Sequence, residues 1–362
     1  MAVPIPVAAV GTGNVGKHAL SQLITDPRFE LTAVWVSSES KSGKDAAALA
    51  GLPDAAATGI RATTDLDAVL GTGPACVVYT AMADNRLPEA LEDYRRILAA
   101  GVNVVGSSAV FLQYPWQVLP DELIAPIEEA ARAGSSSLFV NGIDPGFAND
   151  LLPLALAGTC QSIQQIRCME IVNYNTYDSA TVMFDVMGFG GRIDETPMLL
   201  QPGVLSLAWG SVVRQLAAGL GIELDEVTET HIRLPAPESF DIAAGRIEKG
   251  TTAAMRFEVR GMKDGEVAVV LEHITRLRDD LCPDWPQPAG PGGGYRIEIT
   301  GEPSYDLDLR LSSRNGDHNY AGLVATAARV VNAIPAVIAA EPGIVTALDL
   351  PPISARGLYG RR

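Results

Sequence analysis

Short, continuous apolar runs alternate with segments of helical periodicity through the first part of the chain. Such runs are typical of parallel strands that are buried on both faces, with crossover helices between them. The pattern predicts strands at residues 5–10, 31–36, 60–63, 75–80, 103–105 and 138–140. It predicts helices at residues 16–23, 45–50, 66–70, 87–100 and 123–133. These elements together form an α/β domain with a doubly wound parallel sheet.

Longer strands with partly alternating polarity follow, and they predict a second, α+β domain with a mixed or antiparallel sheet. These strands are expected at residues 166–174, 253–261, 266–277, 295–300 and 305–311. Asp264-Gly265, between two of them, provides the positive φ angles of a tight hairpin turn. Helices are expected at residues 150–158, 198–220 and 320–340. We expect domains at residues 1–145 and 146–315, with a helix and tail at 316–362 that pack back on the first domain.

Length and charge narrow the possible partners. A chain of 362 residues exceeds what one hydrophobic core usually organises, so two domains are the natural expectation. The formal net charge of -16 opposes attraction to nucleic acid or to anionic membrane surfaces. An anionic ligand would therefore need a preformed pocket of backbone N–H groups and a few placed cations.

Cysteine usage and the N-terminal segment indicate a cytoplasmic protein. The four cysteines lie far apart and include no C-x-x-C pair, which favours reduced thiols over a disulfide framework. The first residues already predict a strand and are not preceded by a basic leader. We expect no apolar run to be long enough to cross a bilayer. We therefore expect no membrane partner.

Gly11-Thr12-Gly13-Asn14-Val15-Gly16 matches the G-x-G-x-x-G pattern between a predicted strand and a predicted helix. In this context Gly11 permits the tight turn and Gly13 lets the backbone approach a pyrophosphate. Gly16 allows the helix to pack closely on the strand, and the helix N-terminus attracts the anion. The pattern indicates a Rossmann-type dinucleotide site, the alternative being a glycine turn that binds no ligand.

The same residues also fit the start of a P-loop, G-x-x-x-x-G-K, which would indicate a nucleoside triphosphatase. A P-loop continues with Ser or Thr, whose hydroxyl binds Mg²⁺, whereas this chain continues with His18. The dinucleotide interpretation is therefore favoured.

The loop after the second strand favours NADP as the cofactor, with NAD as the alternative. No acid stands directly at the strand end, where an NAD-preferring domain holds the ribose 2′-OH. Ser37, Ser38 and Lys44 are predicted to contact a 2′-phosphate. Glu39 argues against this assignment, and a solvated loop rich in Ser and Lys remains an alternative.

Further cofactor contacts are expected where strands end at the carboxyl edge of the sheet, since nicotinamide ribose normally rests there. A turn at residues 141–150 joins the two domains, and ligand sites favour such junctions. Asp144 lies in this turn, and its turn-forming role before Pro145 is at least as well supported as a catalytic one. The additional predicted cofactor-binding residues are Thr80, Ala81, Ser107, Ser108 and Asn149.

Reduction of a C=O or C=N bond needs a proton donor beside the transferred hydride. Candidate catalytic residues are Tyr114, Glu170 and Tyr174. Glu170 and Tyr174 would point to the same face of one strand, although a strand tyrosine is more often packing than catalytic.

The histidines show no metal-ligand spacing, so we predict no metal. Asp317 and His318 are interpreted as the cap of the last helix, with His318 also able to reach a cleft.

The chain resembles the dihydrodipicolinate reductase superfamily, within it the branch of 2,4-diaminopentanoate dehydrogenase and native amine dehydrogenases. The likeness covers most of the chain and rests on GTGNVG, VWVSSESKSGKDA, Tyr114-Pro115-Trp116 and GIDPGFAND. It implies an NADPH-dependent reductase of an imine or carbonyl, usually dimeric. It also implies that a ketone, imine or amine is held between the nicotinamide and the sheet of the second domain.

One departure from that branch leaves the chemistry open. The branch places a catalytic glutamate shortly before the Tyr-Pro-Trp motif, whereas residues 107–113 contain no acid. Our leading hypothesis is an NAD(P)H-dependent oxidoreductase that acts as an amine dehydrogenase or as an imine or ketone reductase. The alternative is a catalytically silent NADP-binding sensor or scaffold protein.

Overall fold

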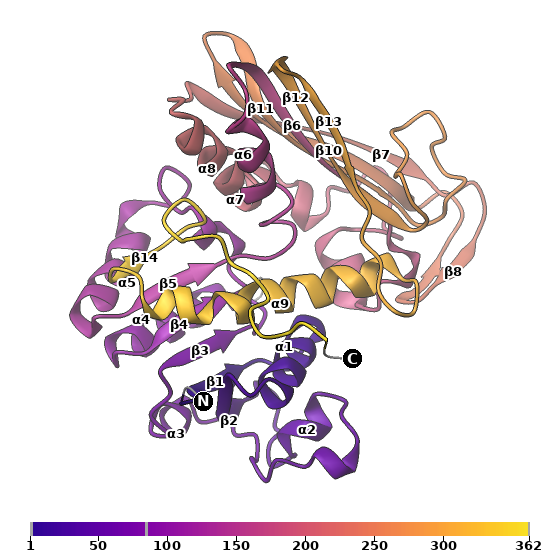
Figure 1. Ribbon diagram of the computed structural model, residues 1–362. Coiled ribbons are helices and arrows are strands. Elements are labelled where there is room, and N and C mark those ends of the chain that lie inside the picture. The colour runs from indigo at the N-terminus through magenta and orange to yellow at the C-terminus, as the bar shows by residue number, and fades with distance from the viewer. Residues whose placement is uncertain (1–2, 84–85, 361–362) are drawn as a thin grey trace. The chain divides into compact units, whose positions relative to one another are not determined.

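A computed structural model describes residues 3–83 and 86–360 of the chain (Figure 1). The chain divides into two compact units: unit 1 comprises residues 1–143 and 323–362, and unit 2 comprises residues 144–322. The expected domain limits, after residues 145 and 315, therefore lie near the observed ones, after residues 143 and 322. The end of the chain contributes both a helix and a strand to unit 1.

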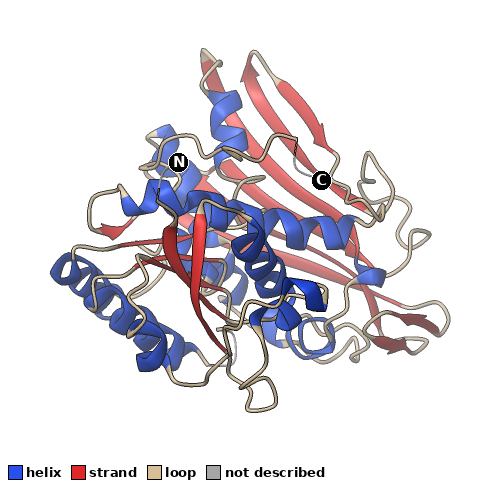
Figure 2. Cartoon of the chain, turned by 60° about the horizontal axis from the view of Figure 1, so that its bottom comes forward, coloured by secondary structure: helices blue, strands red, loops and turns tan. Residues whose placement is uncertain are grey.

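Unit 1 contains a six-stranded parallel sheet with the order β2-β1-β3-β4-β5-β14. Its strands are β1 (Ile5–Val10), β2 (Phe29–Trp35), β3 (Cys76–Tyr79), β4 (Asn103–Gly106), β5 (Ser137–Val140) and β14 (Gly343–Ile344). Its helices are α1 (Asn14–Thr25), α2 (Ala46–Leu49), α3 (Leu66–Leu70), α4 (Leu87–Ala99) and α5 (Asp121–Gly134), with short 3-10 turns η1 (Asp54–Ala56) and η2 (Val110–Gln113). Figure 2 shows these strands between helices. The predicted doubly wound fold is confirmed, and the strand order reverses between β1 and β3, where such sheets bind ligands.

The prediction of a strand at residues 60–63 was wrong. Residues 60–63 make only isolated bridges, Trp35 with Thr63 and Asp45 with Arg61. The Asp45 carboxylate accepts the backbone N–H groups of Thr58 and Gly59, which holds the preceding segment as a turn. The sixth strand is instead β14, which comes from the end of the chain and pairs with β5.

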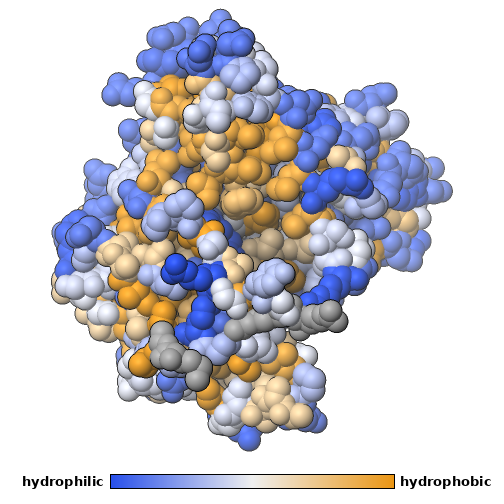
Figure 3. All heavy atoms as spheres, in the orientation of Figure 1, coloured by the Kyte–Doolittle hydropathy of each residue, from blue (hydrophilic) through white to orange (hydrophobic). Residues whose placement is uncertain are grey.

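Helix α9 (His318–Ile338) is long and apolar enough to cross a membrane by length and composition alone, contrary to our expectation that the chain holds no such segment. Its second half, however, lies in the hydrophobic core of unit 1. Val330, Val331, Ile334 and Val337 are fully buried there against strand residues of the parallel sheet. This burial is that of a core helix. Figure 3 shows one face of the molecule, on which hydrophilic and hydrophobic residues are interspersed.

Unit 2 contains a six-stranded mixed sheet with the order β13-β12-β6-β11-β10-β7. Its strands are β6 (Ser162–Asn173), β7 (Glu226–Pro235), β10 (Thr252–Lys263), β11 (Glu266–Arg276), β12 (Gly293–Glu302) and β13 (Tyr305–Leu309), and β8 (Phe240–Ile242) and β9 (Gly245–Ile247) form a separate hairpin. Its helices and turns are α6 (Leu151–Ala157), η3 (Tyr174–Thr176), η4 (Thr181–Val186), η5 (Met198–Leu200), α7 (Val204–Ala208) and α8 (Gly210–Leu220). Strands β6 and β11 are parallel, and the other neighbours are antiparallel. The predicted α+β class of this domain is confirmed.

The two faces of this sheet differ in character. On one face, side chains such as Cys168, Leu271 and Val259 form a core with residues of α7 and α8. Strand residues of the same parity, which include Glu170 and His273, continue this face toward the ends of β6 and β11. The sheet therefore places polar groups at the edge of an apolar core.

Local turn chemistry was a better guide here than hydrophobic alternation. The predicted hairpin is confirmed: Asp264 and Gly265 have φ angles of 51° and 82° between the antiparallel strands β10 and β11.

Strand β7 was missed because it is an edge strand whose residues are mostly polar and at least partly exposed, so it shows no buried alternating face.

Candidate active site

The glycine turn of unit 1 has the geometry of a dinucleotide site. An added Cβ at Gly11, which has a φ angle of 97°, would lie 2.4 Å from the backbone N of Ala81. At Gly16 it would lie 2.4 Å from the carbonyl oxygen of Gly11, so both positions require glycine. At Gly13 an added Cβ would meet no described atom within 4 Å. The space at Gly13 is what a pyrophosphate needs to approach the start of α1.

The other predicted cofactor residues of unit 1 lie where the sequence places them, at the carboxyl edge of the sheet. The Thr80 hydroxyl donates to the Gly11 carbonyl at 3.1 Å and fastens the loop after β3 to the glycine turn. Ser107 and Ser108 follow β4, and the Ser108 carbonyl accepts the Tyr94 hydroxyl at 2.7 Å. Asn149 belongs to unit 2, where its side chain accepts the N–H of Gly146 at 2.8 Å. Cofactor contacts by these residues stay predictions.

A lysine that the sequence analysis did not select lies at the glycine turn. The Lys41 ammonium donates to the backbone oxygen of Thr12 at 3.1 Å and to its hydroxyl at 3.2 Å. Lys44, which was predicted, is exposed. The Ser38 hydroxyl bonds to that of Ser40 at 2.7 Å, and Ser37 is exposed. The sequence alone could not show which of the two lysines lies at the glycine turn, because this depends on the path of the loop.

Glu39, the acid that argued against NADP, has its own hydrogen-bond partner in the structure. Glu39 accepts the hydroxyl of Thr64 at 3.2 Å. Its carboxylate is therefore engaged with the segment before α3, and Lys41 is the charged side chain that contacts Thr12.

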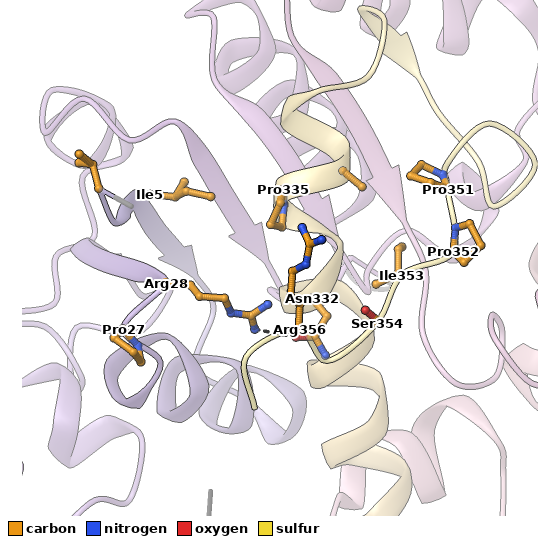
Figure 4. Close-up of a pocket in the computed structure, with 12 residues that line it drawn as sticks. Ile5, Pro27, Arg28, Asn332, Pro335, Pro351, Pro352, Ile353, Ser354 and Arg356 are labelled. Carbon is orange, nitrogen blue, oxygen red and sulfur yellow. Dashed lines mark hydrogen bonds between the residues drawn. The ribbon is translucent and has the colours of Figure 1, made fainter. Parts of the chain in front are cut away.

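A wide cavity of about 780 Å³ in unit 1 lies elsewhere and does not belong to the dinucleotide site (Figure 4). Its lining includes Ile5, at the start of β1, together with Pro335 of α9 and Pro351 of the C-terminal tail. The glycine turn follows the opposite end of β1. We assign this cavity no role in the chemistry.

The polar centre of unit 2 is a row of side chains across four neighbouring strands. Register pairs Tyr295 on β12 with Glu170 on β6, Glu170 with His273 on β11, and His273 with Phe257 on β10. The His273 Nδ1 lies 3.0 Å from Oε2 of Glu170. The Phe257 ring stacks on the imidazole, with centroids 4.7 Å apart and 6° between the planes.

Asp144 completes this cluster from the turn that begins unit 2. Its Oδ1 lies 3.4 Å from Nε2 of His273, an ion-pair contact rather than a well-directed hydrogen bond. It also accepts the indole N–H of Trp209 at 3.3 Å, and the Trp209 ring packs edge-on against the imidazole. Asp144 is thus more than a turn former. Sequence analysis assigned no role to His273, since its partners lie more than 100 positions away in the chain.

Two of the three predicted catalytic residues are in direct contact. The Tyr174 hydroxyl donates to Oε2 of Glu170 at 3.0 Å, so the two side chains lie together as expected, although Tyr174 begins the turn η3 and does not lie on β6. Tyr295 on β12 is the register neighbour of Glu170, and burial together with the nearby Glu170 carboxylate raises the pKa of its hydroxyl. Tyr114 lies in unit 1, where its ring packs edge-on against Trp116 with centroids 5.0 Å apart. Catalytic roles for these residues stay predictions.

The charge of His273 follows from its surroundings. Burial alone would lower the pKa of this imidazole, but the carboxylates of Asp144 and Glu170 raise it to about 10. The side chains of all three residues are less than a tenth exposed, at 6%, 3% and 8% for His273, Asp144 and Glu170. The cluster therefore holds an imidazolium between two carboxylates, with one negative charge in excess.

This raised pKa predicts a pH dependence of stability. The folded-state pKa of about 10 exceeds the ordinary value of 6.5, so the imidazolium stabilises the fold fully below pH 6.5. This contribution is lost as the pH rises toward 10. We expect the free energy of unfolding, measured by urea titration, to fall more steeply from pH 7 to pH 10 in the wild type than in a His273→Gln variant. Parallel curves for the two proteins would contradict the assignment.

The same three side chains also have donor types that could hold a metal ion, and their ligand atoms lie within 4.8 Å of one another. Both imidazole nitrogens, however, face carboxylates, which is the arrangement of a doubly protonated ring. A metal would have to displace a proton from His273 and take a place between the existing pairs. The geometry therefore favours an ion-pair cluster, and the absence of a metal stays a prediction.

His318 has a structural role within unit 2. Asp317 accepts the backbone N–H of Asn319 at 2.8 Å and caps α9, as the sequence predicted. The His318 Nδ1 lies 3.0 Å from the carbonyl oxygen of Leu311, and the residue is 3% exposed. An added Cβ at Gly293 would lie 2.5 Å from the imidazole, so the ring is packed tightly in place.

Comparisons with known proteins identify the family of the chain. Residues 147–358 match the family of the 2,4-diaminopentanoate dehydrogenase C-terminal domain. An amine dehydrogenase from Streptomyces virginiae is 38% identical over 97% of this chain and 98% of its own length. The 2,4-diaminopentanoate dehydrogenase of Acetoanaerobium sticklandii is 24% identical over 77% of this chain and 75% of its own. A solved structure of an amine dehydrogenase from Mycobacterium smegmatis has a TM-score of 0.77 and 23% identity, with 97% of each chain covered.

Proposed function

The chain belongs to the 2,4-diaminopentanoate dehydrogenase C-terminal domain family, and from this membership we propose that it converts a carbonyl compound and ammonia into a primary amine with NADPH. The family relation makes it an NAD(P)-dependent oxidoreductase, as the sequence predicted. The relative from Streptomyces virginiae is an amine dehydrogenase, and the match covers 98% of its length. This supports an amine as product and, in the reverse direction, as substrate.

The charge of the unit 2 cluster is the observation that carries the choice of nitrogen chemistry. Asp144 and Glu170 surround one imidazolium and leave a net negative charge in a buried, aromatic environment. Ammonium, iminium and protonated amines are cations, whereas a ketone is neutral. An excess carboxylate stabilises the cationic species and gives a carbonyl no comparable advantage.

The proposal is tested by following NADPH oxidation with a panel of ketones and aldehydes, with and without ammonium chloride. We expect turnover that depends on ammonium and yields an amine. Equal turnover without ammonium would make the protein a carbonyl reductase. Cofactor binding with no turnover across the panel would instead favour the sensor or scaffold.

We also propose that Lys41 selects NADP over NAD. Its ammonium lies beside the glycine turn, on the loop after β2 that recognises the adenine ribose in such folds. NADP carries a 2′-phosphate that a lysine can pair with, whereas NAD carries a hydroxyl.

Replacing Lys41 by alanine is expected to weaken NADP binding by roughly 10-fold, the loss of one hydrogen bond to a charged group. NAD binding should change by less than about 2-fold, since it has no phosphate at that position. Isothermal titration calorimetry with both cofactors measures this, with Lys44→Ala as the matched control. A larger effect of Lys44→Ala, or equal loss for both cofactors, would contradict the assignment.

A homodimer is the assembly that we propose, in keeping with the family resemblance. Ile232 and Leu234 project from one face of the edge strand β7 and are 52% and 37% exposed. Exposed apolar side chains on a sheet edge favour an apolar partner surface, here a second copy of the chain. Sedimentation should give the dimer mass for the wild type and a shift toward monomer for Ile232→Lys. A wild-type monomer at micromolar concentration would contradict the proposal.

A further inference from the structure

The proposed reaction needs a group that moves protons at nitrogen and oxygen. Ammonium must lose a proton before it can attack a carbonyl as ammonia, and the resulting hydroxyl must gain one before it leaves as water. Residues 107–113, before Tyr114, contain no acid that could do this. The proton-transfer group of this chain must therefore lie elsewhere.

Two buried carboxylates of unit 2 are already held by arginines. Glu272 pairs with Arg167 and, at 2.6 Å, with Arg256. Glu258 pairs with Arg167 at 2.8 Å and with Arg260. This network lies on the sheet face opposite His273, because its residues have the other parity along β6, β10 and β11. These carboxylates are structural.

Two further buried carboxylates have structural partners as well. Asp26 pairs with Arg28 at 2.6 Å, before β2. Asp150 accepts the first backbone N–H of α6 as its cap. Among the buried carboxylates of the described residues, this leaves Asp144 and Glu170, which share one imidazolium and contact no arginine or lysine in any ion pair of the structure.

We propose that Glu170 is the catalytic residue that takes a proton from ammonium and returns it to the departing hydroxyl, with His273 and Asp144 as its positioning residues. This proposal rests on the proposed function. Glu170 is favoured over Asp144 because the Tyr174 hydroxyl and one imidazolium N–H converge on its carboxylate, beside its register neighbour Tyr295. Asp144 faces the far side of the ring, where it orients the imidazolium and is itself held by Trp209.

The proton balance closes with Glu170 alone. Ammonium gives one proton to the Glu170 carboxylate and becomes ammonia, which forms a C–N bond to the carbonyl carbon. The π bond of the carbonyl breaks, and one proton moves from the attacking nitrogen to the oxygen, which gives a neutral carbinolamine. The carboxylic acid then protonates the hydroxyl of this carbinolamine, the C–O bond breaks, and water and an iminium ion result. NADPH supplies the hydride that reduces the iminium carbon to the amine. The carboxylate is regenerated within each turnover.

The surroundings of Glu170 keep it ready to accept a proton. The imidazolium Nδ1 lies 3.0 Å from the Glu170 carboxylate. The raised pKa of His273 keeps this imidazolium charged through the neutral range. Stacking on Phe257 and the edge contact with Trp209 fix the ring plane, so the N–H direction toward Glu170 is set by packing.

A Glu170→Gln variant separates catalysis from structure when two reactions are compared. Reductive amination of a ketone needs both proton transfers, whereas reduction of a preformed cyclic imine needs neither ammonia nor loss of water. We expect kcat for amination to fall by roughly 10²- to 10⁴-fold, the range for loss of a general acid–base group. Reduction of the cyclic imine should fall by less than about 10-fold. Glu258→Gln is the matched control, since Glu258 is as buried as Glu170 but lies on the other face.

The outcomes distinguish this proposal from the proposed function. Equal losses in both reactions, or a comparable loss in Glu258→Gln, would overturn the role of Glu170. A wild type that never uses ammonium would instead overturn the proposed function. Circular dichroism and thermal melting verify that each variant is folded before its rates are compared.

The positioning role is tested by the pH profile of kcat. The groups that face Glu170 are His273, Tyr174 and Tyr295, with Asp144 behind the imidazole. A His273→Gln variant retains a donor but loses the charge, so the acidic limb of the profile should move to higher pH by about one unit or more. A uniform decrease of kcat with an unmoved limb would overturn the positioning role.

Discussion

A Gly13→Val variant is expected to bind NADPH roughly 100-fold more weakly than the wild type. Its backbone angles, φ −77° and ψ −159°, are open to any residue, and the added Cβ meets no described atom within 4 Å. The side chain would therefore occupy the space that the pyrophosphate needs. Loss of one or two hydrogen bonds to a charged group, at about 1.5–3 kcal/mol each, gives an effect of this size.

The measurement is a calorimetric or fluorescence titration with NADPH, together with urea unfolding of the free protein. Gly158→Val is the matched control, because an added Cβ there meets nothing closer than 3.6 Å and Gly158 is distant in sequence from the glycine turn. Gly13→Val should leave the free energy of unfolding within about 0.5 kcal/mol of the wild type, as surface substitutions do. Unchanged NADPH affinity in this variant would contradict the dinucleotide assignment.

Replacing His273 by leucine is expected to lower the free energy of unfolding by about 3–5 kcal/mol at pH 7, the usual cost of removing one partner from a buried ion pair. The variant leaves the carboxylates of Asp144 and Glu170 buried without their counter-charge.

Neutralising both acids provides the control for this second result. Adding Asp144→Asn and Glu170→Gln to His273→Leu removes the unpaired charges and should recover most of the lost stability. Urea unfolding of the three proteins decides the matter. A loss below about 1 kcal/mol in His273→Leu would mean that the cluster is solvated and that its imidazolium is not needed.

Local sequence signals predicted the parts of the fold whose geometry is local. The spacing of Gly11, Gly13 and Gly16 identified the strand-turn-helix unit, since Gly11 and Gly16 are required by close contacts with the loop after β3 and with the turn itself. Asp264-Gly265 identified its hairpin for a similar reason. Strand β14 was missed because a two-residue strand has no detectable period and pairs with β5 from far along the chain.

The sequence predicted some residues of the candidate site and missed others. Glu170 and Tyr174 were expected together because four positions on one strand return to the same face. His273 meets Glu170 through the parallel register of β11 against β6, and Asp144 reaches His273 from a turn far away in the chain, neither of which a local pattern encodes. Lys41 depended in the same way on the path of its loop. Long-range register and loop path are tertiary properties, and they decide which of several polar residues meet.

Deuterium transfer from 4-deuterated NADPH to a ketone in ammonium buffer tests the central assignment most directly. Mass spectrometry of the product should show a primary amine with one deuterium on the former carbonyl carbon. An undeuterated product, or a deuterated alcohol formed equally well without ammonium, would contradict it.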